Sequence, residues 1–347
     1  MKKLLLLAVF TLFASLIYSQ TIVSGNVTGV WEPGGNPYIV TGDVFVVDSL
    51  IIQAGVNVKF QAGGWMIEVG DGDRFLADGT SEDPIVFEPY QGNEPGLWDR
   101  IYIVGSGNDD TLKYCSIRNA ENGIYIHHSY SVIVGCEIYS NITGIYIYAT
   151  SSSFADIYNS TIYKNTNGVW AYGPQSPDNP DAKITNSIIS NNIDYGIRNT
   201  GYGRIDAEDI IYNCFWGNGN NFGSISIPNG FGSNEYQTNF NGDSCDINYN
   251  IYYDPCFVDT TNNNFNLQPI SKSIDAGTNL ILGQFTYDPD GTMPDMGANY
   301  YPHSNASILA YSFPEQTGPA DIDPVNKKIT IEVYDGANIA HLIAEFN

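Results

Sequence analysis

The chain has 347 residues, which is long enough for two ordinary domains or for one long solenoid. It is strongly acidic, because 38 Asp and Glu residues against 14 Lys and Arg residues leave a net charge of −24. This charge argues against nucleic acid as a partner, since phosphates require a basic surface. The 35 Gly and 25 Tyr residues favour strands separated by tight turns. The surplus of carboxylates suits a solvated surface or weak Ca²⁺ sites.

The N-terminal residues have the order of a secretory signal peptide. Lys2 and Lys3 precede an apolar run from Leu4 to Leu16, and small and polar residues follow it. The run is too short for a membrane-spanning helix, and no later segment is apolar enough to cross a bilayer. We therefore expect residues 1–19 to be a signal peptide and the mature chain to be secreted, extracellular or held at the cell surface without a membrane span.

Three stretches between Asn26 and Ile103 carry a family resemblance: "NVTGVWEPGGNPYIVTGDVFV", "FLADGTSEDPIVFEP" and "GLWDRIYI". They resemble the opening coils of right-handed β-helix proteins that bacteria of the Bacteroidetes type secrete. In those proteins L-x-A-x-G-T and P-I-x-F mark successive strands and corners. The resemblance implies a pectate-lyase-like fold and export from a Gram-negative cell. It does not specify an activity, because the family includes polysaccharide lyases, hydrolases and proteins with no known chemistry.

A repeat of 21 to 27 residues fills the middle of the chain, and its anchors are the small residues Cys115, Cys136, Ser160, Ser187 and Cys214. A large apolar residue follows each anchor by two places, and Leu or Ile precedes it by three. Glycine follows the first four anchors by eight or nine places, and asparagine stands directly before the last three. Such a period, with Asn and Gly corners, is typical of a parallel β-helix whose coils stack about 4.8 Å apart. Residues 20–302 are therefore predicted to form an all-β, single-stranded right-handed parallel β-helix (solenoid).

The five cysteines cannot all pair, although export would permit disulfides. Cys115, Cys136 and Cys214 occupy an anchor column, where a cysteine is a small core residue rather than a ligand or a nucleophile. We expect these three to be reduced and buried. Cys245 and Cys256 lie close together in a loop-rich region and are predicted to form the one disulfide.

The C-terminal part contains two further segments. "DPCFVDTTNNNFNLQPISKSIDAG", from Asp254, resembles the segment that closes the last coil in the same family. After it, residues 303–347 resemble the first strands of an immunoglobulin-like module of bacterial surface proteins. About forty residues are too few for a sandwich of roughly one hundred. We expect a linker and an incomplete immunoglobulin-like module there, in a chain truncated at its C-terminus.

Aromatic residues recur at outward positions of the repeat, because their Ile or Val neighbours point inward. Tyr125, Tyr146 and Trp170 occupy one column, which Arg198 continues. A second column holds His127, Tyr148 and Tyr172, and a third holds Arg118, Tyr139 and Tyr163. Stacked rings stabilise one another by up to roughly 1 kcal/mol per pair. An exposed line of rings is also a platform for sugar rings, and the predicted polysaccharide-binding residues are Tyr125, Tyr146, Tyr148, Trp170 and Tyr172.

The candidate catalytic residues are two carboxylates and an arginine. Asp181 and Glu208 stand six places before their anchors and are expected to be neighbours one coil apart, with Arg198 nearby. On this fold such carboxylates serve as an acid and base pair for hydrolysis, or as Ca²⁺ ligands beside a basic residue for β-elimination. Chance also brings carboxylates together in a chain this acidic, and no lyase or hydrolase signature surrounds them.

The sequence thus favours a monomeric exported protein that binds polysaccharide through its aromatic rings, rather than an enzyme. Two alternatives stay open. One is a polysaccharide lyase or glycoside hydrolase that uses Asp181, Glu208 and Arg198, with Asp181 and Glu208 as Ca²⁺ ligands. The other is a structural or adhesive stalk whose partner is a protein.

Overall fold

The structure is a computed structural model. It describes residues 20–105, 110–148, 152–175, 179–281 and 284–303, and the backbone of 321–323 and 328–330. The predicted signal peptide and most of the predicted immunoglobulin-like module lie outside the described residues. The chain divides into two compact units, Met1–Tyr301 and Pro302–Asn347. In the second unit, β29 (Asp321–Asp323) pairs antiparallel with β30 (Lys328–Thr330).

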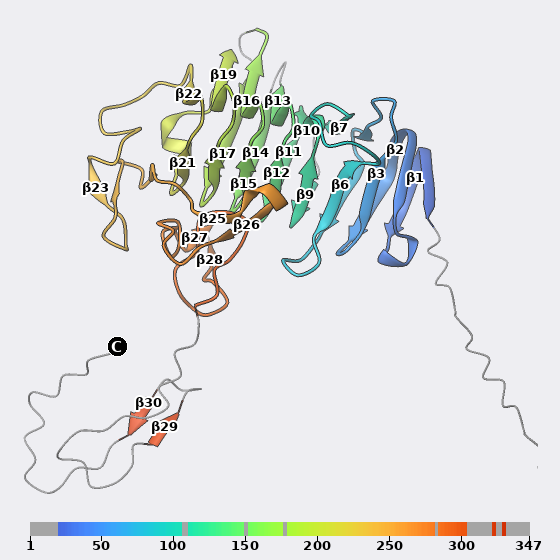
Figure 1. Ribbon diagram of the computed structural model, residues 1–347. Helices are drawn as coiled ribbons and strands as arrows, with labels where there is room; N and C mark the ends of the chain where they lie inside the picture. The colour runs from blue at the N-terminus through green and yellow to red at the C-terminus, as the bar shows by residue number, and fades with distance from the viewer. Residues whose placement is uncertain are drawn as a thin grey trace, which may run out of the picture. The chain divides into compact units, whose positions relative to one another are not determined.

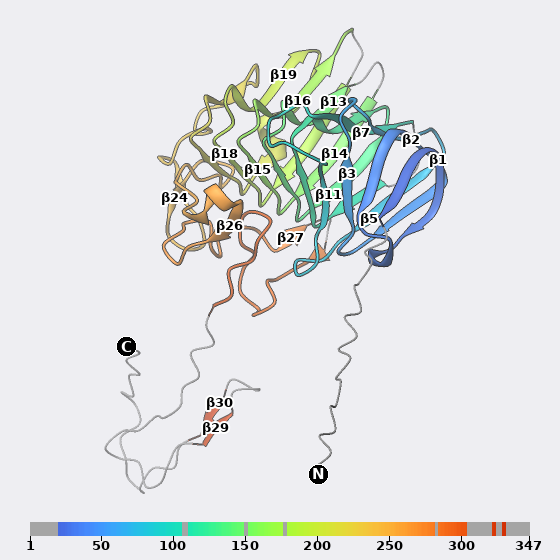
Figure 2. The same ribbon diagram turned by 45° about the vertical axis from the view of Figure 1, so that its right-hand side comes forward.

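The first unit is a parallel β-solenoid in which 22 strands form one continuous hydrogen-bonded set. Successive coils lie side by side from β1 to β22 (Figures 1 and 2). Each turn of the chain adds one strand to each of three parallel faces, so a strand pairs with the strand three places further along the chain. The predicted all-β class and the parallel β-helix are confirmed.

The first two coils are single long strands, β1 (Thr21–Trp31) and β2 (Tyr38–Gln53). The first face then consists of β3 (Asn57–Phe60), β6 (Ile85–Pro89), β9 (Cys115–Arg118), β12 (Glu137–Tyr139), β15 (Thr161–Tyr163), β18 (Ile188–Ser190) and β21 (Cys214–Trp216). The second face consists of β4 (Ile67–Val69), β7 (Trp98–Val104), β10 (Ala120–His127), β13 (Thr143–Tyr148), β16 (Asn167–Gly173), β19 (Tyr195–Gly201) and β22 (Asn220–Gly223). The third face consists of β5 (Arg74–Asp78), β8 (Asp110–Lys113), β11 (Tyr130–Val134), β14 (Ser152–Tyr158), β17 (Asn179–Thr185) and β20 (Ile210–Ile211).

Outside the three faces, the described residues of the first unit hold six short hairpin strands and three helical turns. The strand pairs are β23 (Gln237–Thr238) with β24 (Ser244–Cys245), and β25 (Phe257–Asp259) with β26 (Asn264–Leu267). A further pair joins β27 (Leu280–Ile281) to β28 (Gln284–Phe285). The 3₁₀ turns are η1 (Pro33–Gly35), η2 (Ala207–Asp209) and η3 (Thr260–Asn262). No helix in the described part of the chain is long and apolar enough to cross a membrane.

The core is a set of stacked apolar columns inside the solenoid. Ile133, Ile157 and Ile184 pair in register through β11, β14 and β17, as the repeat predicts, and all three are fully buried. Because a coil has no core of its own, its apolar side chains are removed from water only by stacking on the neighbouring coils. The stability of each coil therefore depends on its neighbours.

Side-chain hydrogen bonds run from coil to coil at the corner where the anchor residues lie. The backbone N–H of Cys115 donates to Cys136 Sγ at 3.5 Å, and that of Cys136 donates to Ser160 Oγ at 3.2 Å. The N–H of Ser160 donates in turn to Ser187 Oγ, and the N–H of Ser187 to Asn213 Oδ1. Each anchor side chain thus satisfies a buried backbone donor of the preceding coil, which explains why small polarisable residues recur there.

A second corner carries a chain of asparagine amides that the sequence analysis did not identify. Asn141 N–H donates to Asn165 Oδ1 at 2.9 Å, and Asn165 N–H donates to Asn192 Oδ1 at 3.0 Å. The Nδ2 group of Asn165 donates both to Ile138 O and to Asn192 Oδ1. Asn218 continues the chain beyond Asn192. This asparagine ladder supplies side-chain acceptors to buried backbone N–H groups between the first and second faces.

The predicted register is wrong by one residue in the last coil. Asn213, not Cys214, follows Ser187 in the anchor column, because β18 and β21 pair Ile188 with Cys214. Phe215 therefore fills the core, while Trp216 points outward and is 42% exposed. The Oδ1 atom of Asn213 accepts the N–H of Ser187. In the earlier coils, the shorter side chain of a cysteine or serine is the acceptor at this position.

All five cysteines are free thiols in the structure. The burial predicted for Cys115, Cys136 and Cys214 is confirmed, although Cys214 packs under the closing segment rather than in the anchor column. The disulfide predicted between Cys245 and Cys256 is not formed. Cys245 lies in the β23–β24 hairpin, whereas Cys256 directly precedes β25 of the next hairpin.

We predict that Asn165→Ala lowers the free energy of unfolding by about 2–4 kcal/mol, because it leaves the buried N–H of Asn141 and the buried carbonyl of Ile138 in the preceding coil without these partners. Chemical denaturation monitored by circular dichroism measures the loss. Asn266→Ala, at an exposed strand position, is the matched control and should change stability by no more than about 0.5 kcal/mol. Equal effects of the two substitutions would contradict a structural role for the asparagine ladder.

Candidate functional site

The outward side of the second face carries a column of aromatic rings. Tyr102, Tyr125, Tyr146 and Trp170 are paired in register through β7, β10, β13 and β16, and Arg198 of β19 follows. Their chain neighbours Ile124, Ile145, Val169 and Ile197 are fully buried, which fixes the rings on the outside. We call this column the aromatic ladder.

Neighbouring rings of the ladder touch edge to face. The centroid distance is 5.0 Å from Tyr102 to Tyr125, 4.8 Å from Tyr125 to Tyr146 and 5.0 Å from Tyr146 to Trp170. The interplanar angles are 83°, 80° and 63° in the same order. The positive edge of one ring meets the negative face of the next, so the rings hold one another in position. The ladder is therefore a preformed surface.

A second outward column widens the ladder. His127, Tyr148 and Tyr172 pair in register with one another, two residues beyond the first column. The ring centroids of Tyr148 and Tyr172 are 5.8 Å apart, and those of His127 and Tyr148 are 4.8 Å apart. The Tyr102 hydroxyl lies 2.8 Å from His127 Nδ1 and links the two columns. Together the columns cover the second face over four coils.

Arginine side chains cover parts of the ladder. The Arg198 guanidinium lies 3.9 Å from the Trp170 ring centroid and donates to Asn167 Oδ1 at 3.1 Å. Arg100, paired with Asp99, lies 4.7 Å from the Tyr125 ring centroid. These cation–π contacts fix Trp170 and Tyr125 further. Arg198 thus ends the ladder as a positively charged hydrogen-bond donor.

The hydroxyl groups of the ladder stay protonated near neutral pH. Burial, with a smaller contribution from the neighbouring Tyr102, raises the pKa of Tyr125 to about 12. Burial also raises the pKa of Tyr102 and Tyr146 above the ordinary value. Each half-buried ring therefore offers an apolar surface together with a hydroxyl that both donates and accepts hydrogen bonds.

The structure brings all five predicted binding residues onto one face: Tyr125, Tyr146, Tyr148, Trp170 and Tyr172. Sequence reasoning missed Tyr102, which extends the ladder by one coil. Its signal was the alternation in "GLWDRIYI", where Ile101 and Ile103 point inward. That stretch lies before the first repeat anchor, so the column alignment did not reach it.

The third aromatic column is not exposed, contrary to the prediction. Residues 257–281 and 284–301, the closing segment, fold back over the first face, and Phe265 lies 5.0 Å from the Tyr139 ring and 5.1 Å from the Tyr163 ring. Tyr139 is only 4% exposed as a result. The repeat gives no information about a non-repetitive segment, so this cover could not be predicted from the columns.

The predicted pairing of Asp181 with Glu208 is also corrected. The carboxylates that act on Asp181 are Asp209 and Asp206, because η2 turns Glu208 outward into solvent. Burial raises the pKa of Asp181 to about 6, and the charges of Asp209 and Asp206 add to the shift. Arg198 lies on β19 over Trp170, on a different face from Asp181 of β17.

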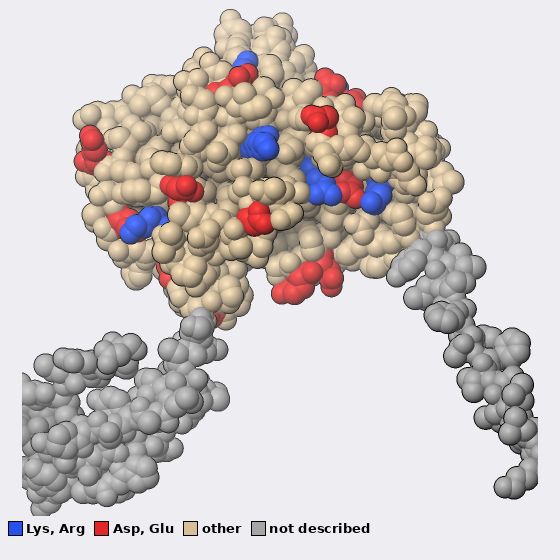
Figure 3. All heavy atoms as spheres, in the orientation of Figure 1, with Lys and Arg blue, Asp and Glu red and all other residues tan. Residues whose placement is uncertain are grey.

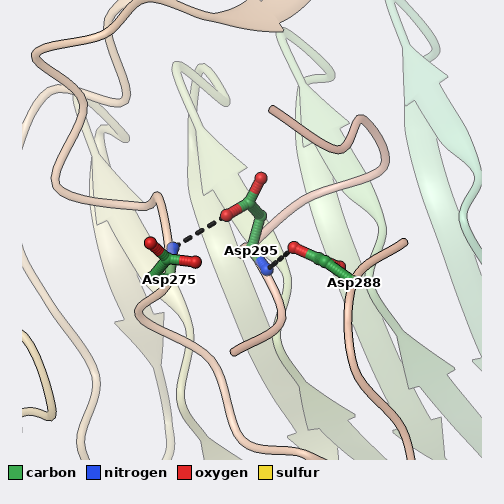
Figure 4. A group of neighbouring side chains, drawn as sticks. All are labelled: Asp275, Asp288 and Asp295. Carbon is green, nitrogen blue, oxygen red and sulfur yellow. Dashed lines mark hydrogen bonds between the residues drawn. The ribbon is translucent and has the colours of Figure 1, made fainter. Parts of the chain in front are cut away.

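A second group of carboxylates lies in the closing segment (Figure 4). Asp275, Asp288 and Asp295 each place one oxygen within 4.8 Å of the others. Asp295 Oδ1 accepts the N–H of Asp275 at 2.7 Å, and Asp288 Oδ2 accepts the N–H of Asp295 at 2.9 Å. Asp288 begins a turn in which Gly291 N–H donates to Asp288 O at 2.8 Å. This set of carboxylate oxygens could hold a hard cation such as Ca²⁺.

A polar cavity of about 290 Å³ lies between the first face and the closing segment. Tyr114, Glu137 and Asn264 line it, and Asn299 Nδ2 donates to Glu137 Oε1 at 2.8 Å. Burial raises the pKa of Glu137. The Asn299 contact ties the closing segment to β12, so the groups lining this cavity already hold the segment in place.

One family model, described as "Right handed beta helix region", matches residues 92–180. No curated protein matches the chain. The first unit of the chain has the right-handed parallel β-helix fold. The matched range includes β7, β10, β13 and β16, the strands that present the aromatic ladder.

The cluster of Asp275, Asp288 and Asp295 in the closing segment predicts that the stability of the protein depends on pH. Burial raises the pKa of Asp288 to about 7, and the Asp295 charge adds to the shift. Because the native pKa lies above the unfolded value near 4, the native state binds more protons between about pH 4 and 7. The contribution of Asp288 to stability is therefore present at low pH and is lost as pH rises through 7.

We expect Asp288→Asn to gain stability relative to the wild type as pH rises from about 4 to 8, since the amide needs no proton. Melting temperatures across this range measure the difference. Glu94→Gln removes the same charge from an exposed site and is the control. A pH-independent difference between Asp288→Asn and the wild type would contradict the assignment.

Proposed function

We propose that the protein binds polysaccharide on the aromatic ladder and does not cleave it. The observation that carries the proposal is a preformed row of half-exposed rings, Tyr102 to Trp170, on a face that the closing segment leaves open. Sugar rings present C–H groups that pack on aromatic faces, and their hydroxyls match the protonated tyrosine hydroxyls. A linear glycan laid along the solenoid axis would contact successive coils.

Two features support binding rather than catalysis. The ladder column itself holds no carboxylate between Tyr102 and Arg198, where a glycosidic bond would lie. The rings also hold one another through edge-to-face contacts, so little side-chain entropy is lost when a ligand binds. A rigid apolar surface of this kind is suited to binding a long polysaccharide chain.

A second candidate function, hydrolysis or β-elimination, rests on Asp181. Its pKa is raised to about 6, mainly by burial, and Asp206 and Asp209 lie beside it, which resembles the arrangement of a general acid among other carboxylates. β17 follows β16 after the segment that begins at Gly173, so Asp181 is close in sequence to Tyr172 of the ladder. Asp181→Asn should abolish any release of reducing ends or unsaturated products if this activity exists.

The proposal also includes export. Lys2, Lys3 and the apolar run that ends at Leu16 support a cleaved signal peptide, and a polysaccharide outside the cell is the corresponding ligand. N-terminal sequencing of the protein from culture medium tests this, and a retained Met1 would contradict it.

Affinity electrophoresis through gels that contain neutral or acidic polysaccharides tests the binding function. We expect retention of the wild type, and binding about five- to thirtyfold weaker for Tyr146→Ala or Trp170→Ala, because each substitution removes a stacking surface worth about 1–2 kcal/mol. Tyr90→Ala removes an exposed tyrosine outside the ladder and is the matched control.

The same incubations are assayed for new reducing ends and unsaturated products. Retention without products supports the binding function, whereas products that depend on Asp181 support the enzyme. If the protein neither binds nor cleaves any polysaccharide, the result supports the structural or adhesive stalk. Equal loss of binding in Tyr90→Ala and Trp170→Ala would contradict the aromatic ladder as the binding site.

A further inference from the structure

The two ends of the solenoid differ. At the C-terminal end, residues 224–256 fold over the last coil, and Phe231 and Tyr252 pack against Phe222 and Phe215. Phe215 N–H also donates to Ile251 O at 2.9 Å, so the cap uses backbone groups of the last coil. At the N-terminal end, β1 pairs with β2 alone among the residues that the structure describes (Figure 1).

At the N-terminal end, the structure exposes backbone N–H and C=O groups of β1 rather than apolar side chains of the core. Of the inward residues of β1, Val23 and Trp31 are 9% and 5% exposed, and Trp31 stacks on Tyr38 at 4.7 Å, while Val27 packs on the core and is partly buried. The end of the core is therefore largely closed. What remains is one edge of an eleven-residue strand, whose N–H and C=O groups on that side have no strand beside them in the described chain.

This edge lacks two of the devices that normally prevent strand pairing, namely charge and proline. Natural edge strands are protected by charged residues, by proline, by β-bulges or by short length. The register of β1 with β2 shifts between Val23 and Gly25 and between Val27 and Gly29, so the edge consists of three short segments that meet at corners of the solenoid. The sequence of β1, "TIVSGNVTGVW", has no charged residue and no proline. In a protein with a net charge of −24, an uncharged strand of this length is a surface where two copies meet without direct repulsion. On the face that Figure 3 shows, no charged residue (blue or red) is visible at the end where β1 lies.

We propose that the β1 edge pairs with the β1 edge of a second copy and forms a two-fold symmetric dimer. A two-fold axis perpendicular to the solenoid makes the meeting strands antiparallel. Residues 25–27 then face themselves, and residues 21–23 face residues 29–31 of the other copy. The two solenoids become one longer sheet-bonded stack, in place of the monomer expected from the sequence.

This arrangement places Asn26 opposite Asn26 of the second copy. Asn26 pairs with Phe45 of β2 and is exposed, so its side chain lies on the outer surface beside the dimer contact. Directly opposite residues of antiparallel strands have Cα atoms about 4.5–5.5 Å apart, which is within disulfide range. One coil edge is small compared with a standard interface of about 1,600 Å², so the dimer is concentration dependent.

Sedimentation velocity of the purified protein over a broad concentration range tests the proposal. We expect a shift from monomer to dimer as concentration rises. Asn26→Lys sets two like charges opposite each other and should weaken self-association roughly tenfold or more. Asn266→Lys, at an exposed position of β26, adds the same charge elsewhere and should leave the dimer intact.

Asn26→Cys gives an independent measurement. Mild oxidation should yield a disulfide-linked dimer at the concentrations where the wild type dimerises, and Asn266→Cys should not. Circular dichroism of each variant verifies that the solenoid is folded. A wild type that stays monomeric at every concentration overturns the proposal, and so does a dimer that Asn26→Lys leaves unchanged.

Discussion

The whole solenoid depends on hydrogen bonds that side chains make to the backbone of the neighbouring coil at two corners. The anchor column and the asparagine ladder supply acceptors to N–H groups that the parallel sheets cannot reach, because the chain turns there. Each bond also fixes the height of one coil relative to the next. The hydrogen bonds at these corners therefore keep the strands of the three faces in register, and this register aligns the rings of the aromatic ladder.

The repeat made much of this predictable. Columns of Ile and of Tyr follow from strand alternation once the coils are aligned, which is why Ile157 and Tyr146 were placed correctly. The errors arose where the period changes or ends. Asn213 displaced Cys214 because a longer side chain took over the anchor's hydrogen bond, and Asp181 met Asp209 because η2 redirected the chain. Neither change alters the spacing of the repeat in the sequence, so neither could be predicted from that spacing.

Aromatic residues serve two purposes on this solenoid, and only tertiary structure separates them. Tyr139 and Tyr163 point outward as Tyr125 and Tyr146 do, yet Phe265 covers the first pair and makes them part of a second core. The ladder stays half-exposed because the closing segment crosses the first face and not the second. The contrast explains why an outward aromatic column is not by itself evidence of a binding surface.

The corner bonds join each coil only to its immediate neighbours, and this has a consequence for how such a protein can change over time. Duplication or loss of one complete coil preserves every corner bond on either side of it. Such an event adds or removes one rung of about 4.8 Å without altering the others. The length of the recognised surface can therefore evolve in whole steps while its cross-section and chemistry remain constant.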